Sequence, residues 1–118
     1  MIFKSVSLLI FLKMFMRIAS KMKLLKGFEA EYKKRHDELW PELKKLLKET
    51  GISDYSIFLD EETKVLFAYF TIEDDKKLED LPNEPVMKKW WAYMKDLMET
   101  NEDNSPLSMP LKEVFYLP

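Results

Sequence analysis

The sequence contains no cysteine, only two glycines and a single histidine among its 118 residues. Without cysteine there can be no disulfide, no thiolate zinc site and no cysteine nucleophile. A single histidine excludes a histidine-rich metal site, although carboxylate metal sites stay open. The two glycines, Gly27 and Gly51, each stand alone, so a glycine-rich phosphate-binding loop is missing. The sequence therefore predicts no metal and no cofactor.

An excess of positive charge is also missing, because 19 Lys and Arg residues stand against 21 Asp and Glu residues. A formal net charge of -2 leaves nothing to neutralise phosphates, so we expect no nucleic-acid partner. With 47% hydrophobic and 14% aromatic residues, the composition is typical of a globular domain. Folding hides only about 60 to 70% of the unfolded surface at this length, so covering one face with a second copy would add stability. We therefore expect a homodimer.

The first fifteen residues differ in composition from the rest of the chain, with two lysines, no acidic group and an apolar run from Val6 to Leu12. That run is far shorter than the roughly 20 residues that span a bilayer, so no membrane anchor is expected. A small-residue cleavage site does not follow promptly, which disfavours an export signal. We interpret residues 1–15 as an N-terminal extension, from an upstream start or a floppy segment, and residues 16–118 as one domain.

The first half of that domain changes from a strand pattern to a helix pattern. Apolar residues alternate from Arg17 to Leu25, which predicts a half-buried strand. From Phe28 to Thr50 they recur every three or four residues, which predicts helix. Pro41 disfavours helix at the residue before it and removes a backbone donor, so two helical pieces are expected. Gly51 is the expected C-terminal cap.

The second half contains further strand and helix signals. Tyr55–Asp60 and Val65–Ile72 are rich in aromatic and β-branched residues and predict an antiparallel hairpin. The segments expected to follow are a helical turn at Asp74–Leu81, a helix that Asn83 caps and that runs to about Met98, a loop at Asn101–Pro110 and a last strand at Glu113–Leu117. The resulting order is βαββαβ, an α+β, ferredoxin-like arrangement with both helices on one face of a four-stranded sheet. The other sheet face must meet water, a ligand or another copy.

His36 is the most informative single residue. Tyr32 and Trp40 lie four residues to either side of it, which places the histidine on the apolar stripe of the helix, facing the sheet. On spacing alone it could be a satisfied core histidine or a catalyst. A pocket that combines this imidazole with the phenol of Tyr55 and the indoles of Trp90 and Trp91 would suit a sugar, although aromatic residues at helical spacing are usually core. The acidic residues of the predicted turns read as solvated loops, namely Glu61, Glu62, Asp74, Asp75, Glu102 and Asp103.

Five stretches occur in the order and at the spacing of one known family: EYKKRHDELWPEL (31–43), YSIFLD (55–60), WWAYM (90–94), DNSP (103–106) and the terminal EVFYLP. Residues 16–118 thereby resemble the L-rhamnose mutarotase family. The resemblance implies a dimeric α/β barrel and a cytoplasmic isomerase that interconverts the α and β anomers of L-rhamnose. It also implies that His36 is the proton donor and that the sugar is contacted by Tyr32, Tyr55, Trp90 and Trp91. The family has no counterpart for residues 1–15.

The implied chemistry agrees with the residues present. Mutarotation removes a proton from the anomeric hydroxyl and gives one to the ring oxygen, so that the ring opens and recloses on the other face. Imidazole can exchange a proton at neutral pH, and no redox change, metal or nucleotide is required. A non-catalytic sugar or small-ligand binding module on the same dimeric barrel is the alternative, and a cofactor-free monooxygenase is a third hypothesis. The sequence leaves open the sugar preference and which tyrosine assists His36.

Overall fold

A computed structural model describes residues 15–118, so the expected extension at residues 1–15 lies outside the described residues except for Phe15. The elements follow the chain in the order β1 (Met16–Lys23), α2 (Glu29–Asp37), α3 (Pro41–Glu49), β2 (Ile52–Asp60), β3 (Val65–Ile72), the 3-10 turns η1 (Asp75–Glu79) and η2 (Leu81–Asn83), α4 (Pro85–Met94) and β4 (Met109–Leu111). None of the helices in this part of the chain has the length and apolar character that crossing a bilayer requires.

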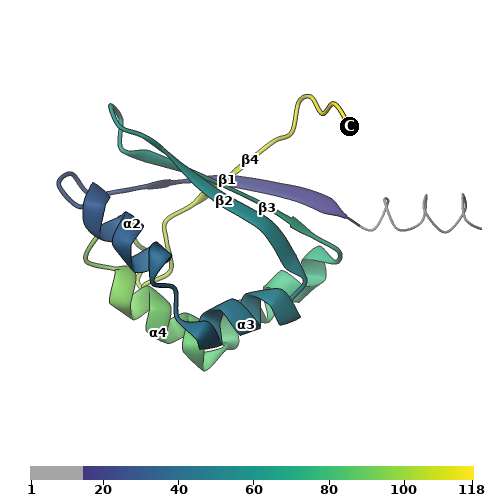
Figure 1. The fold of residues 1–118 in the computed structure, drawn as a ribbon, viewed down its shortest axis with the longest axis horizontal. Coiled ribbons are helices and arrows are strands. Elements are labelled where there is room, and N and C mark those ends of the chain that lie inside the picture. The colour runs from purple at the N-terminus through teal and green to yellow at the C-terminus, as the bar shows by residue number, and fades with distance from the viewer. Residues whose placement is uncertain (1–14) are drawn as a thin grey trace, which may run out of the picture.

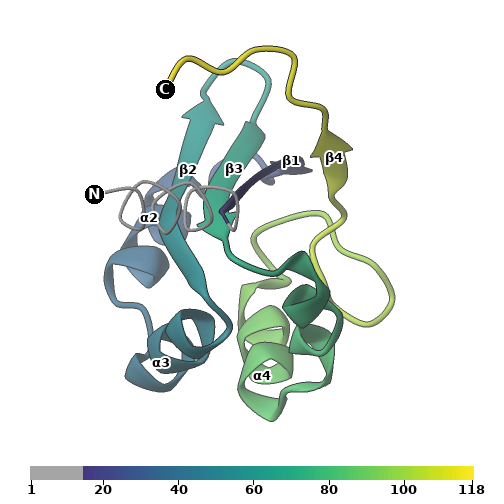
Figure 2. The same ribbon diagram turned by 90° about the vertical axis from the view of Figure 1, so that its right-hand side faces the viewer.

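The strands form one four-stranded antiparallel sheet in the order β2-β3-β1-β4. Helices α2, α3 and α4 all lie on the same side of this sheet (Figure 1). The turned view shows α3 and α4 side by side beneath the strands (Figure 2). The α+β, ferredoxin-like prediction is therefore confirmed.

The two faces of the sheet differ in what covers them. On the inner face, one cross-strand row contains Ile57, Ala68 and Ser20, and the next row includes Leu66, which is almost fully buried. On the outer face, Phe58, Phe67, Lys21 and Met109 form one row from β2 to β4. Phe58 is 68% exposed and Met109 is 58% exposed. No described helix covers the outer face, as the sequence predicted, and this face exposes large apolar side chains.

The break between α2 and α3 and the end of α3 lie where they were expected. Trp40 has an extended backbone, with φ -59° and ψ 131°, because Pro41 follows it and begins α3. Gly51 follows the last residues of α3 with φ +93°, a left-handed conformation that glycine adopts without a steric cost. The helical region of the first half is thus two separate helices, with Tyr32 and His36 on α2 and Trp40 at the junction between them.

The predicted start and end of the last helix were wrong. Asn83 is not its cap, since it belongs to η2, and Glu84 with an extended backbone precedes the first residue, Pro85. A residue before proline is disfavoured in helical conformation, so the helix cannot begin earlier. The helix ends at Met94 and not at Met98, although Met98 remains buried at 5% exposure.

The predicted last strand at 113–117 was also wrong, since β4 comprises Met109–Leu111 and begins within the segment expected to be a loop. β4 runs antiparallel to β1, with Leu111 opposite Ala19. Continuing that register places residue 114 opposite Met16, the first residue of β1, so within residues 15–118 the chain beyond it has no strand to pair with. Val114 and Phe115 are accordingly 90% and 78% exposed.

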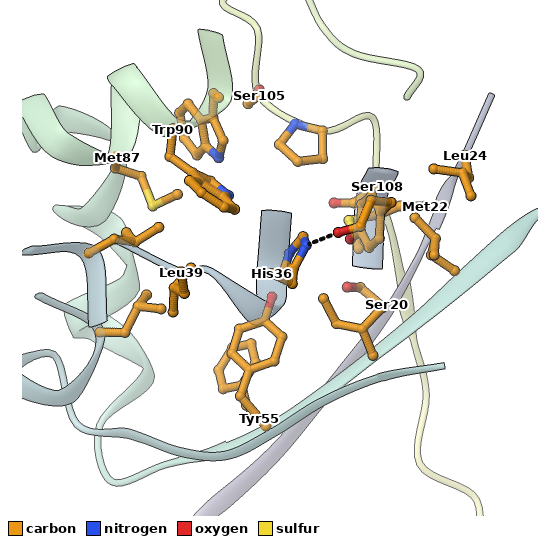
Figure 3. A pocket seen from close by; sticks show the side chains of 18 of the residues that line it. Ser20, Met22, Leu24, His36, Leu39, Tyr55, Met87, Trp90, Ser105 and Ser108 are labelled. Carbon is orange, nitrogen blue, oxygen red and sulfur yellow. Dashed lines mark hydrogen bonds between the residues drawn. The ribbon is translucent and has the colours of Figure 1, made fainter. Parts of the chain in front are cut away.

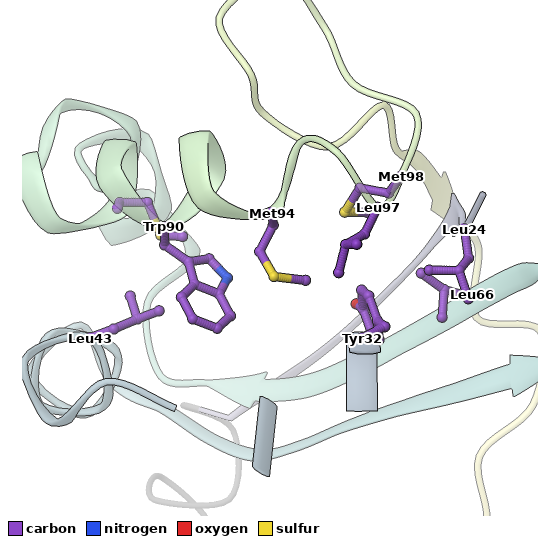
Figure 4. Close-up of a cluster of buried hydrophobic side chains, with 9 residues drawn as sticks. Leu24, Tyr32, Leu43, Leu66, Trp90, Met94, Leu97 and Met98 are labelled. Atoms are coloured by element: carbon purple, nitrogen blue, oxygen red, sulfur yellow. The ribbon is translucent and has the colours of Figure 1, made fainter. Parts of the chain in front are cut away.

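The main core lies between the sheet and the helices (Figure 4). Its buried side chains are Leu24, Tyr32, Leu43, Leu66, Met87, Trp90, Met94, Leu97 and Met98. Three of these nine are methionines, whose flexible side chains fill irregular gaps between aromatic rings. This core fixes α2 and α4 against the inner face and leaves room beside them for a cavity.

Candidate active site

A cavity of about 1100 Å³ lies between the inner face of the sheet and the helices. All five residues singled out in the sequence line it, namely Tyr32, His36, Tyr55, Trp90 and Trp91. They come from α2, β2 and α4, so the fold assembles them from three separate segments. Figure 3 shows His36 at the centre of this group, with Tyr55 pointing toward it from the sheet and Trp90 from α4.

His36 lies in the last turn of α2, and its ring is held on two sides. The ring centroid is 4.3 Å from that of Tyr32, and it meets Trp90 in an edge-to-face contact at 5.4 Å. Its Nδ1 lies 3.0 Å from the Tyr32 backbone carbonyl. A carbonyl can only accept, so Nδ1 carries the hydrogen and donates it. In the neutral ring Nε2 is then the atom with a free lone pair, available to a ligand.

The protonation of His36 follows from its surroundings. Burial lowers the pKa of His36 below its usual 6.5, while the hydrogen bond to Tyr32 and the charge of Asp37 act weakly in the opposite direction. The imidazole is therefore mostly neutral at pH 7. A neutral imidazole with an accessible Nε2 can accept a proton and return it within one catalytic cycle.

A β-bulge determines how Tyr55 enters the cavity. Ser53 pairs with Thr71 and Ser56 pairs with Tyr69, so Asp54 and Tyr55 together oppose one residue of β3. Asp54 takes up the extra residue with φ +52°, a left-handed conformation that aspartate tolerates better than most residues. The ring of Tyr55 then stacks on that of Phe70 with centroids 5.3 Å apart. Bulges commonly redirect a side chain beside an active site, and this one adjusts a residue of the cavity.

The two tyrosine hydroxyls lie in a desolvated environment. Burial raises the pKa of Tyr32 well above its usual value, and the neighbouring Tyr55 raises it further. Burial likewise raises the pKa of Tyr55, although 45% of this residue is reachable by solvent. Tyr55 is surrounded by protein atoms and yet reachable by solvent, because water can enter the open cavity beside its ring. Both phenols stay protonated at neutral pH and can donate a hydrogen bond to a ligand.

The two neighbouring tryptophans have different environments. Trp90 is only 6% exposed and packs edge-to-face on Trp40 at 5.1 Å as well as on His36. Trp91 is half-buried and packs against the edge of the core. Trp90 is therefore both a core residue and part of the cavity wall. The sequence patterns left these two as alternatives for the aromatic residues, and Trp90 fits both.

The loop before β4 contributes a polar part of the wall that the sequence patterns did not predict. Asn101, Asp103 and Ser105 line the cavity, whereas Asp103 had been interpreted as a solvated turn residue. The Asp103 carboxylate accepts hydrogen bonds from the Ser105 hydroxyl and backbone N–H, which hold its pKa below the usual range. The Asn101 amide also donates to Ser105. The DNSP motif was the available signal, but a motif does not tell which surface its loop approaches.

Within residues 15–118 no group of three or more His, Asp or Glu side chains is arranged to hold a metal ion. Glu61 was another acidic residue interpreted as solvated, and it too lines the cavity. The chemistry that the wall can offer comes from an imidazole, phenols, indoles, hydroxyls and isolated carboxylates. This set suits hydrogen bonding to a small polyhydroxylated molecule and the movement of a proton on it.

Comparison with known proteins gives a consistent result. Residues 17–117 match a family model described as L-rhamnose mutarotase. The chain is 59% identical over 102 residues to the L-rhamnose mutarotase of Brucella anthropi, covering 86% of this chain and 96% of that protein. It is 56% identical over 101 residues to the one of Formosa agariphila, covering 86% of this chain and 97% of that protein.

A solved structure agrees with the sequence matches. The crystal structure of an L-rhamnose mutarotase from Formosa agariphila superposes with a TM-score of 0.82 at 55% sequence identity. The match covers 87% of this chain and 99% of the solved chain. The family model and the relatives both span nearly the whole described domain. On this basis the chain belongs to the L-rhamnose mutarotase family.

Proposed function

We propose that this chain interconverts the α and β anomers of L-rhamnose and that His36 moves the proton at the ring oxygen. The activity itself follows from family membership, which makes the chain an isomerase. The observation that carries the role of His36 is its geometry. Its Nδ1 is occupied by the Tyr32 carbonyl at 3.0 Å, so Nε2 remains for the substrate in a cavity large enough for a sugar.

The proton transfer at the ring oxygen works in both directions. During opening, the minor imidazolium form of His36 gives its proton to the ring oxygen as the bond from that oxygen to C1 breaks, and the C1 hydroxyl becomes a carbonyl by releasing its proton to water in the open cavity. During closure, neutral His36 takes the proton from the attacking hydroxyl, and the carbonyl oxygen regains a proton from water. Rotation about the C1–C2 bond between these steps exchanges the anomers. Positioned acid-base groups contribute roughly 10² to 10⁴ in rate, which is appropriate for a reaction that also proceeds spontaneously.

Either Tyr32 or Tyr55 is proposed as the hydrogen-bond partner at the anomeric centre, and the other as a further contact to the sugar. Their raised pKa values keep both phenols protonated, so they orient oxygen atoms of the substrate and do not act as bases at neutral pH. Trp90 and Trp91 are proposed as the surface against which the C–H face of the sugar packs. A cluster of apolar side chains at the α3 end of the cavity suits the methyl group of a 6-deoxy sugar; it comprises Leu39, Leu43, Leu47, Ile52 and Met87.

We also propose a homodimer through the outer sheet face. Phe58 and Phe67 are neighbours on this face, and Met109 follows Lys21 in the same row, so a monomer would expose three large apolar side chains to water. Sedimentation velocity at micromolar concentration should give a dimer, and a monomer would contradict the proposal. A cytoplasmic location is proposed as well, because a catabolic isomerase acts where its sugar is consumed, and cell fractionation can test it.

A non-catalytic sugar-binding module is the alternative. Measuring anomer exchange, and not only binding, distinguishes this alternative from catalysis. Saturation-transfer NMR follows anomer interconversion directly, with L-rhamnose and a panel of other aldoses. We expect acceleration above the uncatalysed background, strongest for L-rhamnose. Binding of the sugar without acceleration of exchange would favour the binding module.

A further inference from the structure

The residue before His36 makes an unusual set of contacts. Arg35 Nη1 donates to the Tyr93 backbone carbonyl at 2.6 Å and to Asp96 Oδ1 at 3.1 Å, and Nη2 donates to Asp96 Oδ2 at 3.4 Å. Its guanidinium carbon also lies 4.1 Å from the centroid of the Tyr93 ring. The side chain is only 13% exposed. We call these three residues, Arg35, Tyr93 and Asp96, the Arg35 clamp.

The clamp joins α2 to the C-terminal end of α4. The last carbonyls of a helix lack partners within the helix and carry partial negative charge, so a cation that donates to one of them is favourably placed. Asp96 follows the end of α4 and neutralises the same cation, and the Arg35 guanidinium holds the pKa of this carboxyl below its usual range. The planar guanidinium can make both contacts and stack on Tyr93 at once, which a lysine ammonium cannot do.

The other contacts of α2 anchor its start and its sheet side: Glu29, its first residue, pairs with Lys64 at 3.0 Å, and Tyr32 is buried. The helix has nine residues, no side-chain cap at its N-terminus and Tyr32 as its only fully buried residue. Helices this short are marginal in isolation, so tertiary contacts determine where they lie. With Tyr32 fixing the sheet side, the nearly buried Arg35 is the strongest described connection from α2 to α4.

The clamp reaches His36 through packed rings. Tyr93 lies 5.8 Å from Trp90, and Trp90 lies 5.4 Å from His36, measured between ring centroids. Tyr93 also stacks on Trp40 at 5.4 Å, at the junction of α2 and α3. Arg35, Tyr93 and Asp96 are not among the described residues that line the cavity. They pack behind the side chains that form the cavity wall and do not line the space that a ligand would occupy.

We propose that Arg35, held by Asp96 and Tyr93, is a positioning residue that sets the contact between His36 and Trp90 in the wall of the cavity. Proton transfer depends steeply on geometry, and a displacement of about 1 Å can cost on the order of 10² in rate. The proposal rests on the proposed function for its catalytic consequence. Its structural consequence, the contact between His36 and Trp90, can be measured independently of activity.

The test uses Asp96→Asn and Arg35→Lys in the full-length chain, with Glu49→Gln as the matched control. Glu49→Gln also replaces one carboxylate of an ion pair by an amide, but its pair with Lys45 lies on the exposed surface of α3 and outside the cavity. Three quantities are measured for each variant: kcat and KM for anomer exchange, the melting temperature, and the His36 imidazole resonances. Because the chain has one histidine, the imidazole resonances are unambiguous, and the Trp90 indole is assigned among the three tryptophans before its NOEs to His36 are measured.

We expect Asp96→Asn and Arg35→Lys to lower kcat about 10-fold or more with a smaller change in KM, and to weaken the NOEs between His36 and Trp90. Glu49→Gln should leave kcat and the NOEs unchanged. Clamp variants that only melt at a lower temperature, with wild-type kcat per folded molecule and wild-type NOEs, would overturn the proposal. If the wild-type protein accelerates no exchange, the proposed function fails, whereas the NOEs still decide whether the clamp positions His36.

Discussion

Deletion of Asp54 should separate the function of the β2 bulge from its effect on stability. Asp54 is the extra residue, since removing it leaves Ser53 opposite Thr71 and Ser56 opposite Tyr69 with one residue, Tyr55, between them. The deletion therefore gives a regular strand without shifting any cross-strand pair. The same step removes a non-glycine residue at φ +52°, whose strain costs roughly 1 kcal/mol.

The two consequences have opposite signs. Relief of about 1 kcal/mol should keep the melting temperature unchanged or raise it by up to roughly 4 to 8 °C in a domain of this size. Without the bulge, the local twist at Tyr55 changes, and its stack on Phe70 at 5.3 Å is redirected. A shift of the Tyr55 hydroxyl by about 1 Å should lower anomer exchange by about 10-fold to 10².

The assay combines thermal unfolding with saturation-transfer NMR of L-rhamnose at equal concentrations of folded protein. Asp54→Gly is the matched control, because glycine accepts a positive φ and keeps the bulge, so its exchange rate should equal that of the wild type. A deletion variant that is stable and exchanges anomers at the wild-type rate would show that the bulge does not position Tyr55 for catalysis. Equal loss of activity in both variants would show that the aspartate side chain acts, and not the bulge.

Three further predictions follow from the same structure. Deleting residues 1–15 should leave soluble, active protein, because β1 begins at Met16; loss of either property would contradict this. Since burial lowers the pKa of His36 below 6.5, the unfolded state binds more protons in that window, so stability should fall as pH drops below about 6.5 toward the lowered value. His36→Asn should abolish this fall in melting temperature between pH 7.5 and 5, where carboxylates, with ordinary values near 4, contribute little. Of Tyr32→Phe and Tyr55→Phe, the one that removes the hydroxyl at the anomeric centre should lower kcat about 10-fold or more; wild-type kcat in both would contradict the proposed role.

The features that could be predicted from the sequence are those set by local patterns. Aromatic and β-branched residues predicted the β2–β3 hairpin, and Pro41 predicted the break between α2 and α3, because each depends on residues near in the chain. The segment 113–117 has a strand-like composition but forms no strand, because a strand needs a partner and β1 ends first. Composition alone cannot supply that register.

In the candidate site, too, contacts between residues near in the chain could be predicted and contacts between distant segments could not. His36 and Tyr32 lie on one helix face, so their proximity followed from spacing. The approach of Asp103 to the cavity, and of Arg35 to Asp96, joins segments far apart in the chain. Such contacts depend on how the elements pack, and the charged residues that make them have no apolar periodicity to reveal them. The bulge at Asp54 was equally hidden, since a single extra residue in a strand leaves both flanking patterns intact.

The most direct test of the central claim is anomer exchange of L-rhamnose at pH 7, measured by saturation-transfer NMR for the wild-type protein and for His36→Asn at equal concentrations of folded protein. Asparagine cannot transfer a proton at neutral pH, so the account predicts acceleration by the wild type and a loss of about 10² or more in the variant. The melting temperature, recorded on the same samples, identifies any loss due to unfolding. Exchange at the wild-type rate per folded molecule of His36→Asn would contradict the claim that His36 moves the proton.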